Sequence, residues 1–200
     1  MFIAGDVFAA APASDLSIKV FAIIDALDVE HKWPAGTRID WETGLPNGKP
    51  VTGTGKNTHC SAFVAVAARA LGIYILRPPE HGTKLLANAQ VDWLLTEGAA
   101  QGWVQLLDMG QAQEKANQGY LVVASYRNHN PEKPGHIVII RPGNKDAATL
   151  AAEGPDETQA GLLNYRSTTL VNGFAGHRRA WSDHEILFFA HEVDETKLGG

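Results

Sequence analysis

Residues 57–72 read NTHCSAFVAVAARALG, and the rest of the chain is interpreted from this stretch outward. Its apolar residues recur at helical spacing, which predicts a helix whose inward face consists of Phe63, Val66, Ala67, Ala70 and Leu71. Asn57 and Thr58 are residue types that cap a helix by accepting its first free backbone N–H groups. Gly72 suits the left-handed turn that closes a helix. We therefore expect a helix with well-defined ends.

The only cysteine of the chain, Cys60, falls in the first turn of this expected helix. Free N–H groups and the helix dipole favour a negative charge there, and the thiolate is the nucleophilic form of cysteine. The position therefore fits a catalytic nucleophile. A lone cysteine in an apolar helix also fits a small, inert core residue, so the stretch by itself leaves both interpretations open.

Length and composition describe an ordinary globular chain of 200 residues, 44% of them hydrophobic and 20% charged. The net charge of −5 argues against nucleic acid as a partner, because a nucleic-acid-binding protein needs a basic face. No apolar run approaches the roughly 20 residues of a membrane-spanning helix. A single cysteine also excludes a disulfide within the chain.

Residues 1–14 are predicted to be an N-terminal arm or the remnant of a secretory signal, followed by a single domain over residues 15–200. The first segment is apolar and reads AAAPA at residues 9–13, as the tail of a signal does. It lacks the positive charge of a signal, and Asp6 interrupts its apolar part. We therefore favour a loose arm over a signal.

Helical patterns come first along the chain and extended patterns follow. Amphipathic spacing predicts helices at residues 15–27, 57–72 and 83–97, and residues 111–118 are expected to form a short polar helix or a turn. Apolar, β-branched runs predict strands at residues 103–107, 120–127, 135–141, 157–160 and 185–191. Because βαβ alternation is missing, the order predicts an α+β fold, in which N-terminal helices, including the one that bears Cys60, pack on a C-terminal antiparallel sheet.

A long irregular segment, residues 28–56, separates the first two helices and is rich in proline and glycine. Trp33 and Trp41 indicate that it is ordered, because aromatic residues are scarce in disordered chain. Long loops inside a compact domain are usually functional. Since this one runs directly into the Cys60 helix, we expect it to form one wall of a cleft.

A cysteine nucleophile needs a base, and His136 is the best candidate in the sequence. It begins a predicted strand directly after a Pro-Gly turn. His136, Val138 and Ile140 share one face of that strand, and if this face packs on the Cys60 helix, the imidazole lies near the thiol. The alternative is a surface histidine beside a turn.

The base in turn needs a residue that orients its ring. Gln159, on the next predicted strand, carries an amide oxygen that can accept from an imidazole N–H. Asn164, placed in a predicted turn, is the second candidate, and Glu157 is the third. The pattern favours Gln159 without excluding the other two.

The remaining histidines carry weaker signals. His59 adjoins Cys60, so it either lines the cleft or occupies the surface. His177, His184 and His191 are spaced seven apart, but no cysteines or carboxylates with ligand spacing accompany them. We therefore predict no metal site.

The order of these features resembles that of the papain-like peptidoglycan hydrolases, both the NlpC-type peptidases and the CHAP amidases. The matching segments are HCSAFV at residues 59–64, PGHIVII at residues 134–140 and the segment around Gln159. NlpC-type enzymes usually carry Asp where this chain has His59, and Gly where it has Ala62. The chain also has a long insert between Leu71 and Tyr120.

The resemblance implies a single papain-like catalytic domain over residues 15–200 and a bacterial cysteine amidase that cleaves an amide bond of cell-wall peptides. Cys60 would be the nucleophile, His136 the base and Gln159 the residue that orients it. The residues expected to contact substrate are Asn57, His59, Trp41 and Asn164.

Such an enzyme would act in the periplasm or cell wall, secreted or delivered to other cells. Its partners would be a peptidoglycan peptide and an inhibitor or immunity protein, and we expect a monomer. No cofactor is expected, because the sequence contains no Gly-rich phosphate loop, zinc spacing or Rossmann fingerprint.

Two other functions stay open at the level of sequence. The same Cys-His chemistry supports acyl transfer or deamidation, as in transglutaminase-like proteins, in which an amine can replace water as the acceptor. A non-catalytic module could instead hold cell-wall peptide while Cys60 stays buried and inert. Thiol reactivity distinguishes the non-catalytic module from an enzyme, since a catalytic cysteine alkylates rapidly below pH 7 and a core cysteine does not.

Overall fold

The computed structural model describes residues 11–51 and 55–198, and six antiparallel strands form one sheet within them. The strand order is β1-β6-β2-β3-β4-β5, so the first and last strands of the sequence are neighbours near one edge of the sheet. The strands are β1 Trp103–Leu106, β2 Leu121–Tyr126, β3 His136–Ile140, β4 Asp156–Ala160, β5 Asn164–Thr169 and β6 Leu187–His191.

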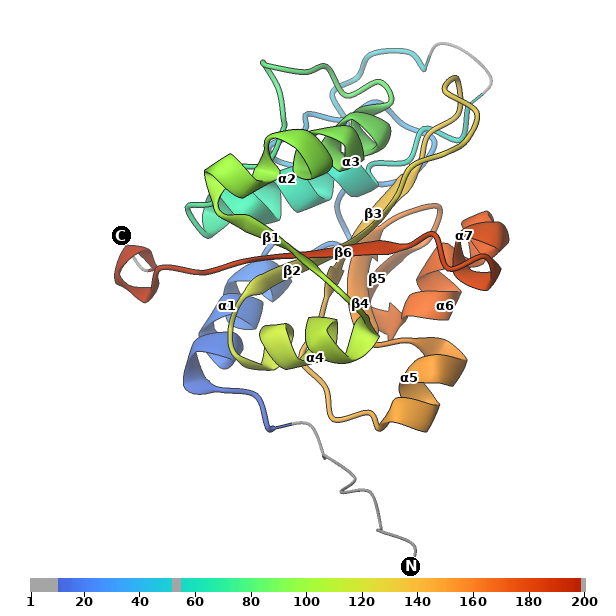
Figure 1. Cartoon of the computed structure of the whole chain (residues 1–200). Helices are drawn as coiled ribbons and strands as arrows, with labels where there is room; N and C mark the ends of the chain where they lie inside the picture. Colours follow the sequence, from blue (N-terminus) through green and yellow to red (C-terminus); the bar gives the residue numbers. More distant parts are fainter. Residues whose placement is uncertain (1–10, 52–54, 199–200) are drawn as a thin grey trace, which may run out of the picture.

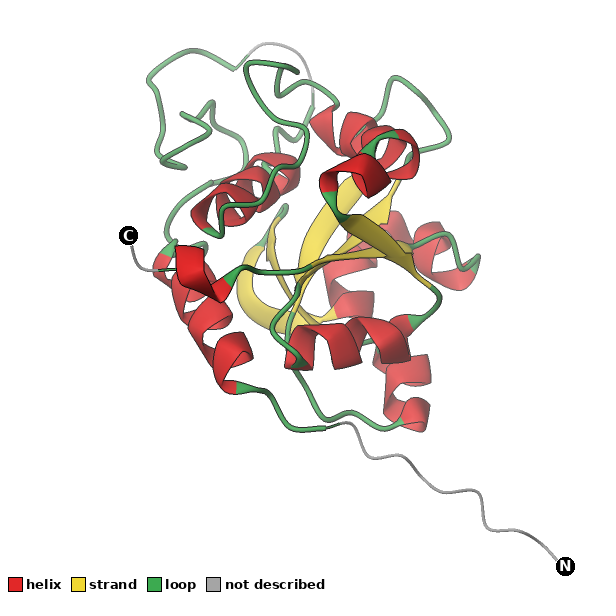
Figure 2. Cartoon of the chain, turned by 60° about the vertical axis from the view of Figure 1, so that its left-hand side comes forward, coloured by secondary structure: helices red, strands yellow, loops and turns green. Residues whose placement is uncertain are grey.

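Helices cover both faces of this sheet (Figures 1 and 2). The α-helices are α1 Asp15–Ala26, α2 Cys60–Ala70, α3 Leu86–Thr96, α4 Met109–Asn117, α5 Ala147–Glu153, α6 Leu170–Gly173 and α7 Arg178–Ser182. Short 3-10 turns are η1 Gly98–Gln101, η2 Phe174–His177 and η3 Glu195–Lys197. α1, α2 and α3 lie over one face, and α4 and α6 contact the other. The predicted α+β class, with helices followed by an antiparallel sheet, is confirmed.

The first helix matches its predicted start, because Ser14 caps α1 by accepting from the Ser17 N–H at 3.1 Å. Of the predicted N-terminal arm, residues 1–10 lie outside the described residues. Residues 11–14 are held by Asn117, whose side-chain amide donates to the Ala11 carbonyl at 2.6 Å. None of the helices among the described residues is long and apolar enough to span a bilayer.

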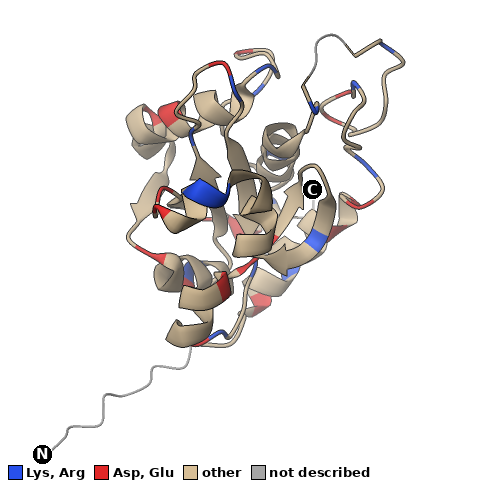
Figure 3. Ribbon diagram, turned by 90° about the vertical axis from the view of Figure 1, so that its right-hand side faces the viewer, with Lys and Arg blue, Asp and Glu red and all other residues tan. Residues whose placement is uncertain are grey.

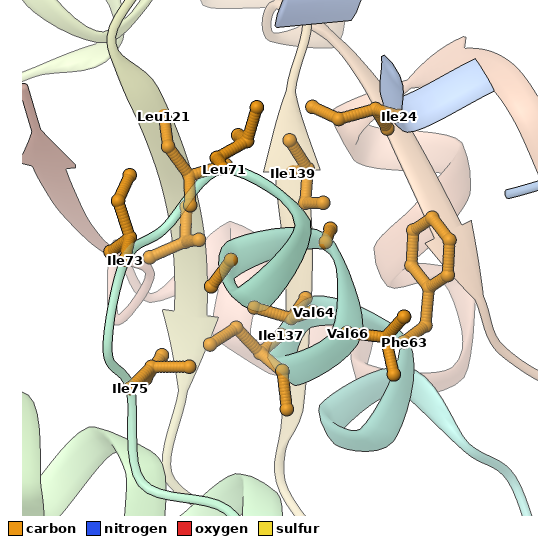
Figure 4. Close-up of a cluster of buried hydrophobic side chains, with 14 of the residues drawn as sticks. Ile24, Phe63, Val64, Val66, Leu71, Ile73, Ile75, Leu121, Ile137 and Ile139 are labelled. Atoms are coloured by element: carbon orange, nitrogen blue, oxygen red, sulfur yellow. The ribbon is translucent and has the colours of Figure 1, made fainter. Parts of the chain in front are cut away.

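α2 is the centre of the larger core, and it is more deeply buried than its pattern predicts. Every residue from Cys60 to Ala68 is buried, so the helix has apolar contacts on all sides instead of one inward face. Ala70, predicted to face inward, is exposed. Figure 4 shows α2 side chains such as Phe63 and Val64 against Ile137 and Ile139 of β3. Small alanines allow the sheet and the neighbouring helices to approach closely.

The two ends of α2 differ from each other. Its C-terminus follows the prediction: Gly72 has φ +71°, and the Ile73 N–H donates to the Ala68 carbonyl at 2.9 Å. The predicted N-caps are wrong, because the cap position belongs to His59, which makes no side-chain cap hydrogen bond. Asn57 instead donates its side-chain amide to the Thr37 carbonyl of the long loop.

We considered that the face of β3 with His136, Val138 and Ile140 would pack on α2, but the opposite face does so. Ile137 and Ile139 contact the α2 side of the sheet, whereas Val138 and Ile140 belong to the cluster on the opposite face. Period-two alternation therefore places His136 with Val138 on the face away from α2. Both sets of residues are β-branched and apolar, so the pattern itself could not decide between the faces.

The elements that escaped prediction include one strand, β5, and three short helices, α5, α6 and α7. Asn164, expected in a turn, begins β5, an edge strand of mostly polar residues that pairs with β4. Residues 147–153 form α5. β5 and α5 both lack the apolar periodicity on which the other predictions were based.

Candidate active site

Cys60 is the first residue of α2, and its side chain reaches the start of β3. The residue is 4% exposed, and three backbone N–H groups, those of Ile137, Ser61 and Cys60 itself, lie near enough to its thiol to favour the charged form. The Ile137 N–H can face the thiol because β3 and β4 pair only further along the strand, at Ile139–Thr158 and Ile140–Glu157. Backbone N–H groups alternate between the edges of a strand, so Ile137 points toward β4 where the ladder has ended.

Burial raises the pKa of the Cys60 thiol, and the three backbone N–H groups only partly oppose this effect. The sequence-based expectation of a stabilised thiolate is therefore wrong for this state of the protein. A helix N-terminus favours the charged form, but removal of water from the sulfur outweighs it. Cys60 is a neutral thiol at neutral pH.

His136 and Gln159 are joined directly, with 2.7 Å between His136 Nε2 and Gln159 Oε1. Both residues are buried. The amide orientation of Gln159 is fixed because its Nε2 donates to the Leu163 carbonyl at 3.0 Å. Its oxygen must therefore accept from a protonated His136 Nε2. This tautomer leaves the lone pair on His136 Nδ1, and the backbone of Gly173 also lies beside the ring.

The three candidates for the residue that orients His136 have different contacts in the structure. Asn164 donates its side-chain amide to the carbonyls of Val29, Lys32 and Trp33, at distances from 2.7 to 3.2 Å. It ties β5 to the long loop and has no contact with His136. Glu157 is fully buried, and neither carboxylate oxygen has a hydrogen-bond partner among the described residues.

Glu157 lies beside the site without joining it. Burial raises the pKa of its carboxyl well above the usual value. The nearest basic group, Arg141, is paired with Asp25 of α1 at 2.7 Å. Close approach is possible because residue 173 is glycine: a Cβ there would lie 2.3 Å from Glu157 Oε1.

His177 is the residue that sequence reasoning missed. Its ring stacks on His136 with centroids 5.6 Å apart and planes inclined by 21°. Phe174 packs edge-on against His136 at 4.9 Å. Burial lowers the pKa of His136 to about 4. Burial, and then the charge of His136, also lower the pKa of His177 to about 4. Both rings are neutral at pH 7.

The sequence singled out His177 only by its seven-residue spacing from His184, and of His184 from His191. That spacing raised the question of a metal site and gave no sign of a contact with His136. His191 bonds the Gln101 carbonyl at 2.8 Å and packs on Trp103, far along the sheet from His136. Among the described residues, no cluster of three or more His, Cys, Asp or Glu side chains is arranged to hold a metal ion.

Cys60 and His136 approach the start of β3 from its two faces. The thiol lies against the backbone of Ile137, the residue that follows His136. No hydrogen bond joins the thiol to the His136 ring within the part of the chain that the structure describes. The start of β3 therefore has an oriented, neutral imidazole on one face and the neutral thiol of Cys60, from α2, on the other.

A pocket of about 390 Å³ opens at the N-terminus of α2. Its lining comes from the long loop and the two residues after it (Arg38, Ile39, Asn47, Asn57 and Thr58), from the start of α2 (His59, Ser61 and Ala62), and from Thr83 and Lys84. The prediction that the long loop forms one wall of a cleft is confirmed.

The four predicted substrate contacts divide into two pairs. Asn57 and His59 line the pocket. His59 is 8% exposed, with Nε2 3.0 Å from the Thr37 carbonyl, and burial lowers its pKa. Its alternative surface position is therefore wrong. Trp41 packs on the outer side of the loop near Arg69, whose guanidinium lies 6.0 Å from the ring centroid, and Asn164 lies at β5.

Comparison with known proteins gives one informative similarity. The chain is 33% identical over 93 residues to the peptidoglycan amidase Tse1 of Pseudomonas aeruginosa, a match that covers 46% of this chain and 51% of that protein. The chain thus matches about half the length of this curated relative. No protein-family model matches the chain.

Proposed function

We propose that this chain is a papain-like cysteine amidase that hydrolyses an amide bond in peptidoglycan peptides. The observation that carries the proposal is the buried His136–Gln159 hydrogen bond, with the thiol of Cys60 beside the backbone of Ile137, the residue that follows His136. The partial similarity to a peptidoglycan amidase supports the choice of substrate. Cys60 is the proposed nucleophile, His136 the base and Gln159 the residue that orients it.

In the first step, the Cys60 sulfur attacks the amide carbonyl and a carbon–sulfur bond forms. The thiol proton moves to His136 Nδ1, and the carbonyl electron pair moves to oxygen. Collapse of this intermediate breaks the carbon–nitrogen bond, and His136 returns the proton to the departing amine. A thioester on Cys60 results.

Water then completes the reaction. His136 Nδ1 takes a proton from water as its oxygen attacks the thioester, and the departing sulfur recovers that proton from His136. Throughout both steps Gln159 accepts from His136 Nε2–H and holds the ring in one tautomer. The backbone N–H of Cys60, at the uncapped start of α2, is the proposed donor to the developing oxyanion.

The charge state at rest sets one feature of this mechanism. Burial raises the pKa of Cys60 and lowers the pKa of His136, so both groups start neutral. Proton transfer therefore accompanies attack, instead of preceding it as it would in a resting thiolate–imidazolium pair. Cys60 should accordingly alkylate slowly below pH 7 in the absence of substrate, so thiol reactivity at rest does not separate this amidase from a non-catalytic module and turnover must do so.

The test is mass spectrometry of soluble fragments from purified peptidoglycan incubated with the parent protein and with Cys60→Ala. Circular dichroism establishes that both are folded. New fragments from the parent alone would support a Cys60-dependent hydrolase, and their masses would identify the bond.

Other outcomes would overturn the proposal. Equal release by both proteins would remove Cys60 as nucleophile. Amine adducts in place of hydrolysed ends, when an amine is added, would favour acyl transfer. No release by a folded parent protein would favour the binding module.

A further inference from the structure

The pocket at the start of α2 has a charge opposite to that of the whole protein. The chain carries a net charge of −5, yet the described residues that line the pocket include Arg38 and Lys84 and no carboxylate. Acidic residues are spread widely over the ribbon (Figure 3). The lack of acidic groups in the pocket is therefore a local feature and does not reflect the composition.

The two cations are available to a ligand. Arg38 and Lys84 are exposed, and neither forms an ion pair with any residue that the structure describes. Arg69 of α2, by contrast, is already paired with Glu42. A guanidinium and an ammonium that have no protein carboxylate to pair with can bind a carboxylate of a ligand.

The pocket is lined by three separate segments of the chain. Arg38 comes from the long loop and Lys84 from the segment before α3, so cations lie on two separate walls. His59, Ser61 and Ala62 form the third side and flank Cys60 in sequence. No side chain caps α2, so the dipole of this 11-residue helix adds positive potential at the same place.

We propose that this pocket selects substrates by their free carboxylates, with Arg38 and Lys84 each pairing with one carboxylate of an anionic peptide. The proposal rests on the function proposed above and specifies it. Stem peptides of the cell wall carry side-chain and terminal carboxylates, which some bacteria convert to carboxamides. The pocket then discriminates against the amidated form, because a carboxamide gives the two cations no charge to neutralise.

Binding measurements on the inactive Cys60→Ala protein test this proposal independently of turnover. The probes are a peptidoglycan stem tetrapeptide with free carboxylates and the same peptide with every carboxylate converted to carboxamide. Isothermal titration calorimetry gives the dissociation constants at low and high salt. Arg38→Gln and Lys84→Gln are added singly and together. Lys49→Gln is the matched control, since Lys49 is an exposed cation of the same loop that does not line the pocket.

We expect the carboxylate peptide to bind about tenfold more tightly than the carboxamide peptide, each substitution to weaken it about threefold to fivefold, and salt to reduce the difference. The carboxamide peptide should be insensitive to both substitutions, and Lys49→Gln should change neither affinity. Equal affinities for the two peptides, failure to bind either, or the same loss in Lys49→Gln would overturn the carboxylate pocket.

The result separates this inference from the proposed function. Cys60-dependent fragment release by the parent protein, together with equal affinities, would leave the amidase intact and reject the carboxylate pocket. Selective binding of the carboxylate peptide without any fragment release would keep the pocket and reject the amidase.

Discussion

The site at the start of β3 and the pocket beside it lie at the same end of α2, and their physical environments are opposite. Cys60 and His136 are 4% and 6% exposed, and both are neutral at pH 7. The pocket is open to solvent and carries Arg38 and Lys84. One region excludes water and charge, and the other presents unpaired charge to water.

The difference indicates a division between reaction and recognition. Hydrogen bonds and charges are stronger away from water, so a dry site can orient one imidazole with one amide. Long-range attraction of an ionic substrate needs charges that remain solvated and mobile. Substitutions in the two regions test this division, because each should affect either turnover or binding.

The largest effect is expected from loss of the reacting groups. Cys60→Ala and His136→Ala should each lower kcat by at least about 10³-fold, because each removes a group that changes bonds or protons in the reaction. Fragment release from peptidoglycan measures kcat, and circular dichroism checks the fold. Substantial activity in either folded variant would remove that residue from the mechanism.

The next effect is on stability. The pKa of His136 is about 4 in the folded protein and near 6.5 when unfolded, so the unfolded chain binds the proton first as the pH falls. His136 should therefore lower the free energy of unfolding by about 3 kcal/mol between pH 6.5 and pH 4. His177, whose pKa is also about 4, adds an effect of the same sign.

Urea denaturation of the parent and of His136→Gln across this pH range measures the contribution of His136. The variant should show a smaller loss of stability on acidification. Parallel curves for the two proteins would mean that the His136 ring is not held neutral by burial.

A smaller change in rate is expected at Gln159. Gln159→Ala should lower kcat/KM by about 10- to 100-fold, because His136 loses the acceptor that holds its tautomer. Gln159→Glu keeps an acceptor oxygen and adds negative charge, which raises the pKa of His136 and moves the acid limb of the rate profile to higher pH.

Asn164→Ala is the comparison for these variants, because Asn164 holds backbone carbonyls of the long loop. It should lower thermal stability more than kcat. A larger loss of kcat in Asn164→Ala than in Gln159→Ala would mean that Gln159 is not the residue that orients His136.

The smallest effect is expected at Glu157. Its raised pKa means that the folded protein keeps a proton that the unfolded chain releases above about pH 4.5, so stability falls as the pH rises. Glu157→Gln should be more stable than the parent by about 1 kcal/mol at neutral pH, with a gain that grows with pH. Chemical denaturation at pH 5 and pH 8 measures it, and a gain that does not change with pH would contradict the buried neutral acid.

The sequence predicted those elements whose residues have one dominant pattern. β2 and β3 are continuous apolar runs, and both strands were predicted. The next strand, which carries Gln159, was also predicted, and Gln159 forms a hydrogen bond with His136. The N-terminus of α2 was misplaced because Asn57 and Thr58 are good caps in isolation, whereas Asn57 is drawn to the Thr37 carbonyl by the folded loop.

Other features depend on packing between distant segments. The thiolate expected from the helix terminus depended on solvent that the folded chain removes from Cys60. The stacking of His177 on His136 joins η2 to β3, which no local spacing reveals. The pocket cations come from two loops that the fold brings together at α2.

The most direct test of the central claim is intact-protein mass spectrometry of the enzyme, quenched with acid during turnover of a stem peptide. The account predicts an added mass equal to the acyl part of the substrate, mapped by digestion to the peptide that contains Cys60 and absent from Cys60→Ala. An adduct on another residue, or continued turnover by Cys60→Ala, would contradict it.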